Sequence, residues 1–161
     1  MRVLFCLVLA FYVTGGMMVA SAQDTPDERE TLKGLKGVRV VVEDLKPEVE
    51  QAGLTKASIQ TDVELKLRLA GIPILTDSDA PFLLVDPQIL RGSSGIWSFC
   101  IKVELGQKVF LSRAPAIGLL ASTWSVGSFG HVSEDTVRTL RDPIKDKVDQ
   151  FINAYSSVNP R

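Results

Sequence analysis

Bulky apolar residues alternate with polar ones along several stretches of the chain, and this spacing predicts β-strands. The clearest stretch begins at Ile96, where every second side chain as far as Leu105 is large and apolar. Such a strand has one side in a core and the other at least half in solvent. We expect the buried side to comprise Trp97, Phe99, Ile101, Val103 and Leu105.

Four further stretches show strand character: 38–43, 72–75, 81–90 and 117–129. Pro87 removes a backbone donor from the third, which predicts a sheet edge or a bulge at that point. Gly106 predicts a bulge in the long strand, after which Val109 and Leu111 continue its pattern. In the last stretch Leu120, Trp124 and Val126 are expected to share one face.

Helical spacing is clearest between Thr55, a predicted N-cap, and Gly71, a predicted left-handed stop. The expected buried face consists of Ile59, Val63, Leu67 and Ala70, widened by Leu65 and Leu69.

A second helix is predicted to begin after Ser133. Pro143 should either kink it or start a new segment capped by Asp142. A single helical turn is predicted over 46–53.

The resulting order, β-α-β-β-β-β-α, predicts an α+β fold. We expect a two-layer α/β sandwich, with a mixed sheet of about five strands and two helices on one of its faces. The first strand–helix–strand unit, which ends at 72–75, should bring two parallel strands together through a right-handed crossover. The later strands should form an antiparallel meander.

The first 22 residues are typical of a secretory signal peptide. A positive start at Arg2 is followed by an uncharged apolar run that ends in Ala20-Ser21-Ala22. Cleavage after Ala22 would place the protein in the periplasm or outside the cell. The alternative is a leader retained as a membrane anchor, and contact with a membrane is expected only in that case. Residues 23–31 are expected to be a flexible lead-in, and residues 32–161 a single α/β domain.

Charge and cysteine content narrow the classes of function. The chain has 18 basic and 19 acidic residues, a net charge of −1, which argues against a nucleic-acid-binding protein. Loss of the leader removes Cys6 and leaves Cys100 without an internal partner. An odd cysteine in an exported chain indicates an intermolecular contact or a sheltered thiol.

Motifs of recognised chemistry are not found in the sequence. There is no G-x-S-x-G elbow and no glycine-rich phosphate loop, and one histidine with one cysteine cannot build a zinc site without several carboxylates. No metal and no cofactor are therefore expected. An enzymatic alternative is a small hydrolase or ligand binder that uses a cleft near His131 and the 76–80 loop.

Four segments, "LKGLKGVRVVVEDL", "TDVELKLRLAGIPIL", "ASTWS" and "DQFINAYSSVNP", resemble a group of small exported bacterial proteins of unassigned activity. The β-α-β-β-β-α order is also similar to the N-terminal domain of the translocation protein TolB and to curli-assembly lipoproteins. That resemblance is one of architecture, and it implies an interaction module of the cell envelope.

These observations favour an exported, non-enzymatic domain that binds an envelope protein or a second copy of itself. A purely structural envelope protein is the third hypothesis. The predicted binding surface is the uncovered face of the sheet. Its candidate residues are Ser98, Cys100, Lys102, Glu104, Arg39 and Glu43.

Overall fold

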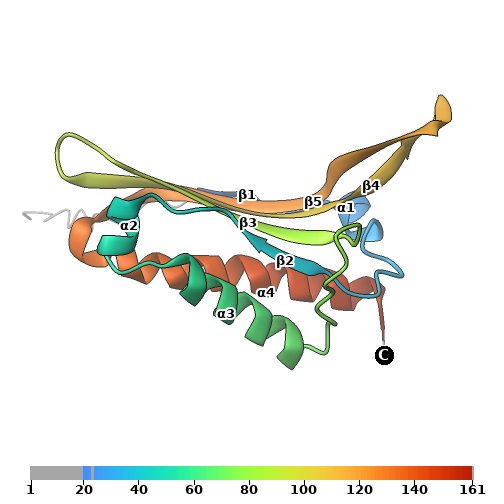
Figure 1. The fold of residues 1–161 in the computed structure, drawn as a ribbon, viewed down its shortest axis with the longest axis horizontal. Coiled ribbons are helices and arrows are strands. Elements are labelled where there is room, and N and C mark those ends of the chain that lie inside the picture. The colour runs from blue at the N-terminus through green and yellow to red at the C-terminus, as the bar shows by residue number, and fades with distance from the viewer. Residues whose placement is uncertain (1–19, 23, 161) are drawn as a thin grey trace, which may run out of the picture.

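The computed structural model describes residues 20–22 and 24–160. Most of the predicted leader, residues 1–19, lies outside the described residues. Five strands form one sheet in the order β1-β5-β4-β3-β2 (Figure 1). β2 and β3 are parallel, and all other neighbours are antiparallel. The strands are β1 (Ala20–Ala22), β2 (Arg39–Val42), β3 (Phe82–Arg91), β4 (Ile96–Leu111) and β5 (Ala114–Ser133).

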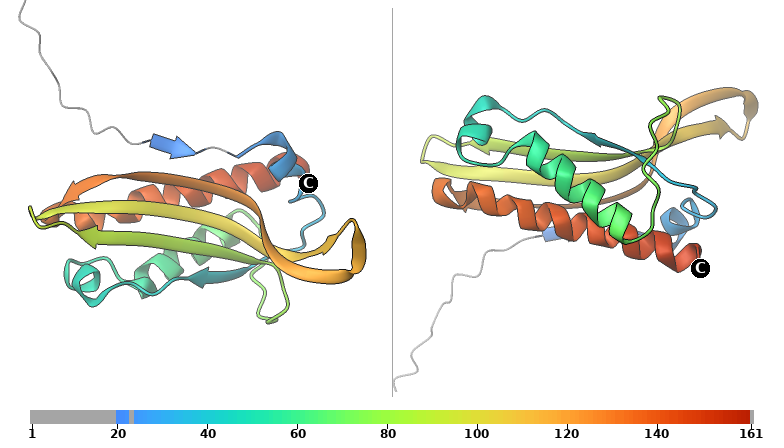
Figure 2. Two further views of the ribbon diagram at one scale, coloured as in Figure 1. Left: turned by 90° about the horizontal axis from the view of Figure 1, so that it is seen from above. Right: turned by 60° about the horizontal axis from the view of Figure 1, so that its bottom comes forward.

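Two long helices lie side by side against one face of this sheet (Figures 1 and 2). They are α3 (Lys56–Leu69) and α4 (Arg141–Val158). The shorter elements are α1 (Pro26–Glu30), α2 (Pro47–Gln51) and the 3₁₀ segment η1 (Glu134–Leu140). This arrangement confirms the predicted α+β fold, a two-layer sandwich with two helices on one face.

The core lies between the sheet and these helices, and β4 supplies its centre. All five predicted apolar positions of β4 are buried, and Trp97 keeps only 1% of its surface exposed. Trp124 of β5 meets Phe151 of α4 edge to face, with ring centroids 5.2 Å apart. Aromatic pairs of this geometry stabilise a core by about 0.5–1.5 kcal/mol beyond their buried area.

The prediction of a strand over 72–75 is wrong. Val38 and Ile74 form an isolated parallel bridge, and the parallel partner of β2 is β3. Pro73 accepts a hydrogen bond from the Val38 amide but has no N–H to extend a ladder, and the polar 76–80 turn follows at once. The expected count of about five strands is therefore slightly off: the predicted domain supplies four, and the fifth, β1, consists of three residues of the predicted leader.

Pro87 and Gly106 occupy the kinds of position predicted for them. β2 pairs with β3 only from Phe82 to Val85, so Pro87 lies where β3 has a single ladder partner, β4. Gly106 marks a register shift between β4 and β5. Edge strands and bulges are the places where a sheet tolerates proline and glycine.

The bulge overturns the predicted position of Leu120. Leu105 pairs with Trp124, but Gly106 pairs with Ser122, so Thr123 is an extra residue in β5. One added residue moves every side chain beyond it to the opposite face of the sheet. Leu120 is therefore 64% exposed, whereas Trp124 is buried.

Gly106 is required because the Phe82 ring lies directly over it. A β-carbon at Gly106 would be 2.3 Å from Cζ of Phe82. The Arg39 guanidinium carbon lies 5.4 Å from the centroid of the same ring. Beyond this point residues 106–122 of β4 and β5 form a hairpin, here called the arm, that bends away from the helices (Figure 1).

The long helix α3 begins and ends as predicted. The Thr55 side chain accepts a hydrogen bond from the Ser58 amide, and Gly71 has a φ of 69°. Leu65 and Leu69, however, are exposed and do not widen the buried face. A residue two positions away is turned by about 200° around a helix, which places both leucines opposite the buried stripe.

The C-terminal helix begins as a separate segment at Arg141, after η1. Its N-cap is Leu140, where the sequence predicted Asp142. Pro143 stands in the first turn of α4, where backbone N–H groups have no helical acceptor, so its missing N–H costs no helical hydrogen bond. Of the two alternatives, the new segment is correct and the kink is not.

The lead-in over 23–31, expected to be flexible, contains α1. Thr25 and Glu28 form a reciprocal capping box at its start. The Asp24 carboxylate accepts hydrogen bonds from Arg29 and, at 3.0 Å, from Nε1 of Trp124. A cap and a contact with a core indole therefore hold a segment whose composition alone indicated disorder.

The contact between Asp24, Arg29 and Trp124 predicts a loss of stability in acid. The Arg29 guanidinium, which donates a hydrogen bond to Asp24, holds the pKa of that carboxyl below its ordinary 3.8. The contribution of the ionised carboxylate is therefore complete above about pH 4 and is lost as the pH falls through the lowered value. Asp24→Asn should reduce the free energy of unfolding by about 1–2 kcal/mol at pH 7 and have little effect near pH 2, measured by urea unfolding.

The matched control is Asp27→Asn, an exposed position in the same helix, which should change stability by less than about 0.5 kcal/mol at either pH. An equal loss for Asp24→Asn at both pH values would contradict the assignment.

The packing of Phe82 on Gly106 predicts that a single added methyl group destabilises the fold. Gly106→Ala should cost about 1–3 kcal/mol in urea unfolding, because the ring must move off the strand. In a Phe82→Ala background the same substitution should cost at least about 1 kcal/mol less. Additive effects in this double-mutant cycle would show that the ring does not restrict position 106.

Candidate functional site

The predicted binding residues lie on the sheet face that points away from α3 and α4, here called the outer face. Ser98, Cys100, Lys102 and Glu104 alternate with the buried residues of β4, and the Cys100 thiol is exposed. Lys102 Nζ lies 2.5 Å from Oε1 of Glu104. This contact raises the pKa of Lys102.

The two predicted residues from the first strand are separated from the β4 group. β3 lies between β2 and β4, so a whole strand separates Arg39 from Glu104. Glu43 follows the end of β2, and its amide donates to the carbonyl of Val85. The structure thus places Arg39 beside a different part of the outer face, at the base of the arm, and leaves Glu43 exposed at the rim of the sheet.

Two adjoining hollows lie on the outer face where the arm bends. They have volumes of about 390 and 170 Å³, and both are lined by Phe82 and Leu120. We call them together the cradle. Residues of the cradle used below are Arg39, Phe82, Leu84, Glu104, Lys108 and Leu120.

The bend at the bulge forms the cradle. Leu120 comes to the outer face because Thr123 is the extra residue in β5. Phe82 lies over Gly106 and forms part of both hollows. Sequence periodicity missed this site because Leu120 was assigned to the core. The signal that could have found it is Gly106, where the sequence predicted a bulge in the long strand.

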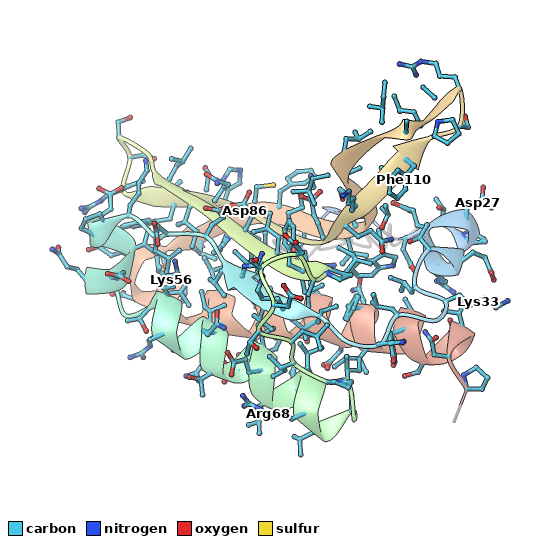
Figure 3. The ribbon with its side chains drawn as sticks, turned by 45° about the vertical axis from the view of Figure 1, so that its right-hand side comes forward. Asp27, Lys33, Lys56, Arg68, Asp86 and Phe110 are labelled. Carbon is cyan, nitrogen blue, oxygen red and sulfur yellow. The ribbon has the colours of Figure 1, made fainter. Side chains whose placement is uncertain are left out.

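The cradle combines apolar surface with charges of both signs, because Asp79 lines its larger hollow together with Arg39 and Lys108, and Glu104 lines the smaller one. Among the described residues, Arg39 and Lys108 have no carboxylate partner within ion-pair distance, whereas Glu104 is paired with Lys102. Nε of Arg39 is buried and makes no hydrogen bond with a described residue. Lys108 Nζ lies 5.8 Å from the ring centroid of Phe110, which stands farther out on the arm (Figure 3).

A second group of side chains lies at the opposite end of the outer face. Oγ of Ser98 and Nδ1 of His131 are 3.0 Å apart on neighbouring strands. Cys100 pairs with Phe129, and Ser98 pairs with Leu90. Phe129 and Leu90 are 58% and 52% exposed, so this end presents apolar side chains around one thiol and one imidazole.

The cleft predicted between His131 and the 76–80 loop is not formed. The loop lies beside the cradle and a separate groove of about 620 Å³ that includes Lys36 and Gln107. His131 is level with Leu90 on β3, eight residues from Phe82, or about 26 Å along the strand. The loop and the histidine are therefore at opposite ends of the sheet.

Neither a metal-binding cluster nor a membrane-spanning helix is found in the part of the chain that the structure describes. Among the described residues, no group of three or more His, Cys, Asp or Glu side chains is placed to hold a metal ion. Within the same part of the chain, no helix has both the length and the apolar character needed to cross a bilayer. What the outer face does provide is apolar surface with two cations at one end and a Ser–His pair at the other.

Comparisons with known proteins add no family to this description. No protein-family model matches the sequence, and no curated protein matches it. The resemblance to small exported proteins and to the TolB architecture therefore stays a prediction, and the proposal of a function depends on the geometry of the outer face.

Proposed function

We propose that this chain is an exported, non-enzymatic protein-binding module of the cell envelope. Its partner docks a polypeptide segment that carries an apolar side chain and a carboxylate into the cradle. The observation that supports this most directly is Leu120, 64% exposed beside a hollow that Phe82 also lines, with Arg39 and Lys108 at its rim.

The apolar part of the argument concerns surface left in water. Leu120 and Phe110 are both more than 60% exposed on the arm, and Phe82 and Leu84 are half-buried below them. Covering one such side chain fully stabilises a complex by about 1.5–3 kcal/mol before the costs of association. An exposed apolar surface with a polar rim is a common mark of a protein-docking site.

The charged part of the argument identifies the partner's chemistry. Arg39 and Lys108 present positive charge at the cradle, and no described carboxylate forms an ion pair with either. Asp79 lines the same hollow but forms no ion pair with either cation, so a carboxylate on the docking segment would supply that ion pair and the missing hydrogen bond of the guanidinium. A polypeptide fits better than a small ligand, because the apolar contacts continue out of the cradle along the arm to Phe110.

The cellular location belongs to the same proposal. The positive start, apolar run and Ala-Ser-Ala ending support removal of residues 1–22 and release into the periplasm or the medium. A partner would then be another envelope or extracellular protein. Retention of the leader would instead hold the domain at the membrane, with the outer face still available for docking.

Site-specific photo-crosslinking in intact cells tests the docking site. Benzoylphenylalanine in place of Leu120 should crosslink to a discrete partner polypeptide, because that side chain lies in the contact. The same group in place of Leu65, which is 51% exposed on α3, should give no matching product. When Arg39→Gln is added to the protein that carries benzoylphenylalanine at position 120, the crosslinking yield should fall about two- to fivefold. Arg68→Gln on α3, added in the same way, should leave the yield unchanged.

Equal crosslinking from positions 120 and 65 would contradict a specific cradle. So would a Leu120 product that is unchanged by Arg39→Gln.

A second candidate, a small hydrolase, is favoured by one observation, the Ser98–His131 pair. A serine hydroxyl within hydrogen-bond distance of a histidine nitrogen is the first half of a nucleophile–base pair. Among the described residues no carboxylate hydrogen-bonds the His131 ring, so the orienting acid of a triad is not supplied. The pair also lies on the outer face, where the His131 side chain is exposed.

Labelling with a fluorophosphonate probe distinguishes this candidate. The protein-binding proposal expects no labelling above that of a Ser98→Ala variant. Labelling of the wild type that is lost in both Ser98→Ala and His131→Ala would instead establish the hydrolase.

A further inference from the structure

The strand β5 lies next to one edge of the sheet, and only the three residues of β1 separate part of it from that edge. Ala20, Ser21 and Ala22 pair with Phe129, Ser128 and Gly127 in an antiparallel ladder. All three belong to the segment that the sequence predicts to be removed. Cleavage after Ala22 would therefore leave the backbone of β5 without this neighbour.

The composition of β5 would leave such an edge prone to pair with another strand. Its 20 residues, 114–133, contain no lysine, arginine, aspartate or glutamate. The opposite edge, β2, is only four residues long, includes Arg39, and is followed by Glu43 and Asp44. Proteins usually protect an edge strand by shortness or by charge, because its unpaired N–H and C=O groups accept another strand. β2 has both protections, whereas β5 has neither.

The vacated part of β5 has clear limits. Oγ1 of Thr31 donates to the carbonyl of Thr123, 3.1 Å away, and so occupies the edge at that residue. The edge uncovered by loss of β1 runs from 124 to 133, and Ser128, the residue that Ser21 opposes, lies next to its midpoint. The site is therefore long enough for a complete strand, of which β1 fills only the centre.

We propose that this edge is a strand-acceptor site, filled by Ala20–Ala22 before processing and by β5 of a second copy of the chain afterwards. The two β5 strands pair antiparallel about a twofold axis near Ser128 and join two sheets into one. The inference depends on the removal of residues 1–22, but not on the cradle, which lies at the other end of the sheet.

A second copy suits this edge for two reasons. An antiparallel strand pair is self-complementary about a twofold axis, so one sequence can supply both sides. An axis near Ser128 also places Phe129 opposite Gly127 of the second copy, and an aromatic ring can cover a cross-strand glycine. No charge on either strand opposes the approach.

Sedimentation of purified protein tests the proposal, with a reductant present so that a Cys100 disulfide cannot contribute. The chain that begins at Gln23 keeps its whole core, because every buried core residue lies between Leu32 and Ala154. It should be a reversible dimer. Phe129→Lys should raise the dissociation constant about tenfold or more, because two lysines meet near the axis.

Leu90→Lys is the matched control. Leu90 is exposed to a similar extent on the same face, 52% against 58%, but lies on β3, which β4 separates from β5. It should leave the dimer unchanged. A chain that begins at Ala20 should dimerise measurably more weakly than one that begins at Gln23, because its own β1 competes for the same backbone groups.

Two results would overturn the inference: a monomeric Gln23 chain, or equal weakening by Phe129→Lys and Leu90→Lys, which would indicate pairing through the outer face. Loss of the dimer would not affect the photo-crosslinking result at Leu120, and failure of that result would not affect the dimer. The two proposals can therefore fail separately.

Discussion

Burial of one side of β4 is the constraint on which the rest of the structure depends. Five large side chains of that strand point toward α3 and α4, and the alternation that sends them inward sends Ser98, Cys100, Lys102 and Glu104 outward. A slip of one residue in this strand would expose Trp97 and Phe99 and bury a lysine and a glutamate. The free energy of that exchange is large enough to fix the register of both neighbouring strands, and with it which residues can meet a partner.

The alternation fails at one point, and that point creates the candidate site. The extra residue at Thr123 exchanges the faces of β5, so the arm carries Leu120 on the side that the body of the sheet leaves polar. Gly106 allows the bend because Phe82 occupies the space in which a side chain would stand. A bulge that re-aims side chains next to a binding surface is a frequent use of this irregularity. The apolar character of the cradle thus comes from a local interruption of the alternation that directs apolar side chains into the core.

The fold could be predicted from the sequence because its signals are local. Period-two spacing, the Thr55 cap, the Gly71 stop and the glycine at the bulge each reported the structure around them. The errors in the prediction arose where contacts between residues distant in the sequence determine the local structure. Asp24 reaches Trp124 across 100 residues and orders a polar segment, and the 72–75 run lacks the second N–H that a ladder needs. The outer-face residues of β4 could be named in advance, but of the cradle only Arg39 and Glu104 could, since its other members come from β3 and the arm.

The two edges of the sheet show how the same backbone can be protected or left open. β2 is short and flanked by charge, so a strand added there would gain few hydrogen bonds and would bury Arg39, Glu43 or Asp44 at a cost. β5 gains its protection from three residues that lie inside the predicted leader. Their backbone pairs there with Phe129, Ser128 and Gly127. In the precursor the leader would cover the centre of this edge, in the processed chain a second copy would pair along it from 124 to 132, and export would be the step that exchanges one partner for the other.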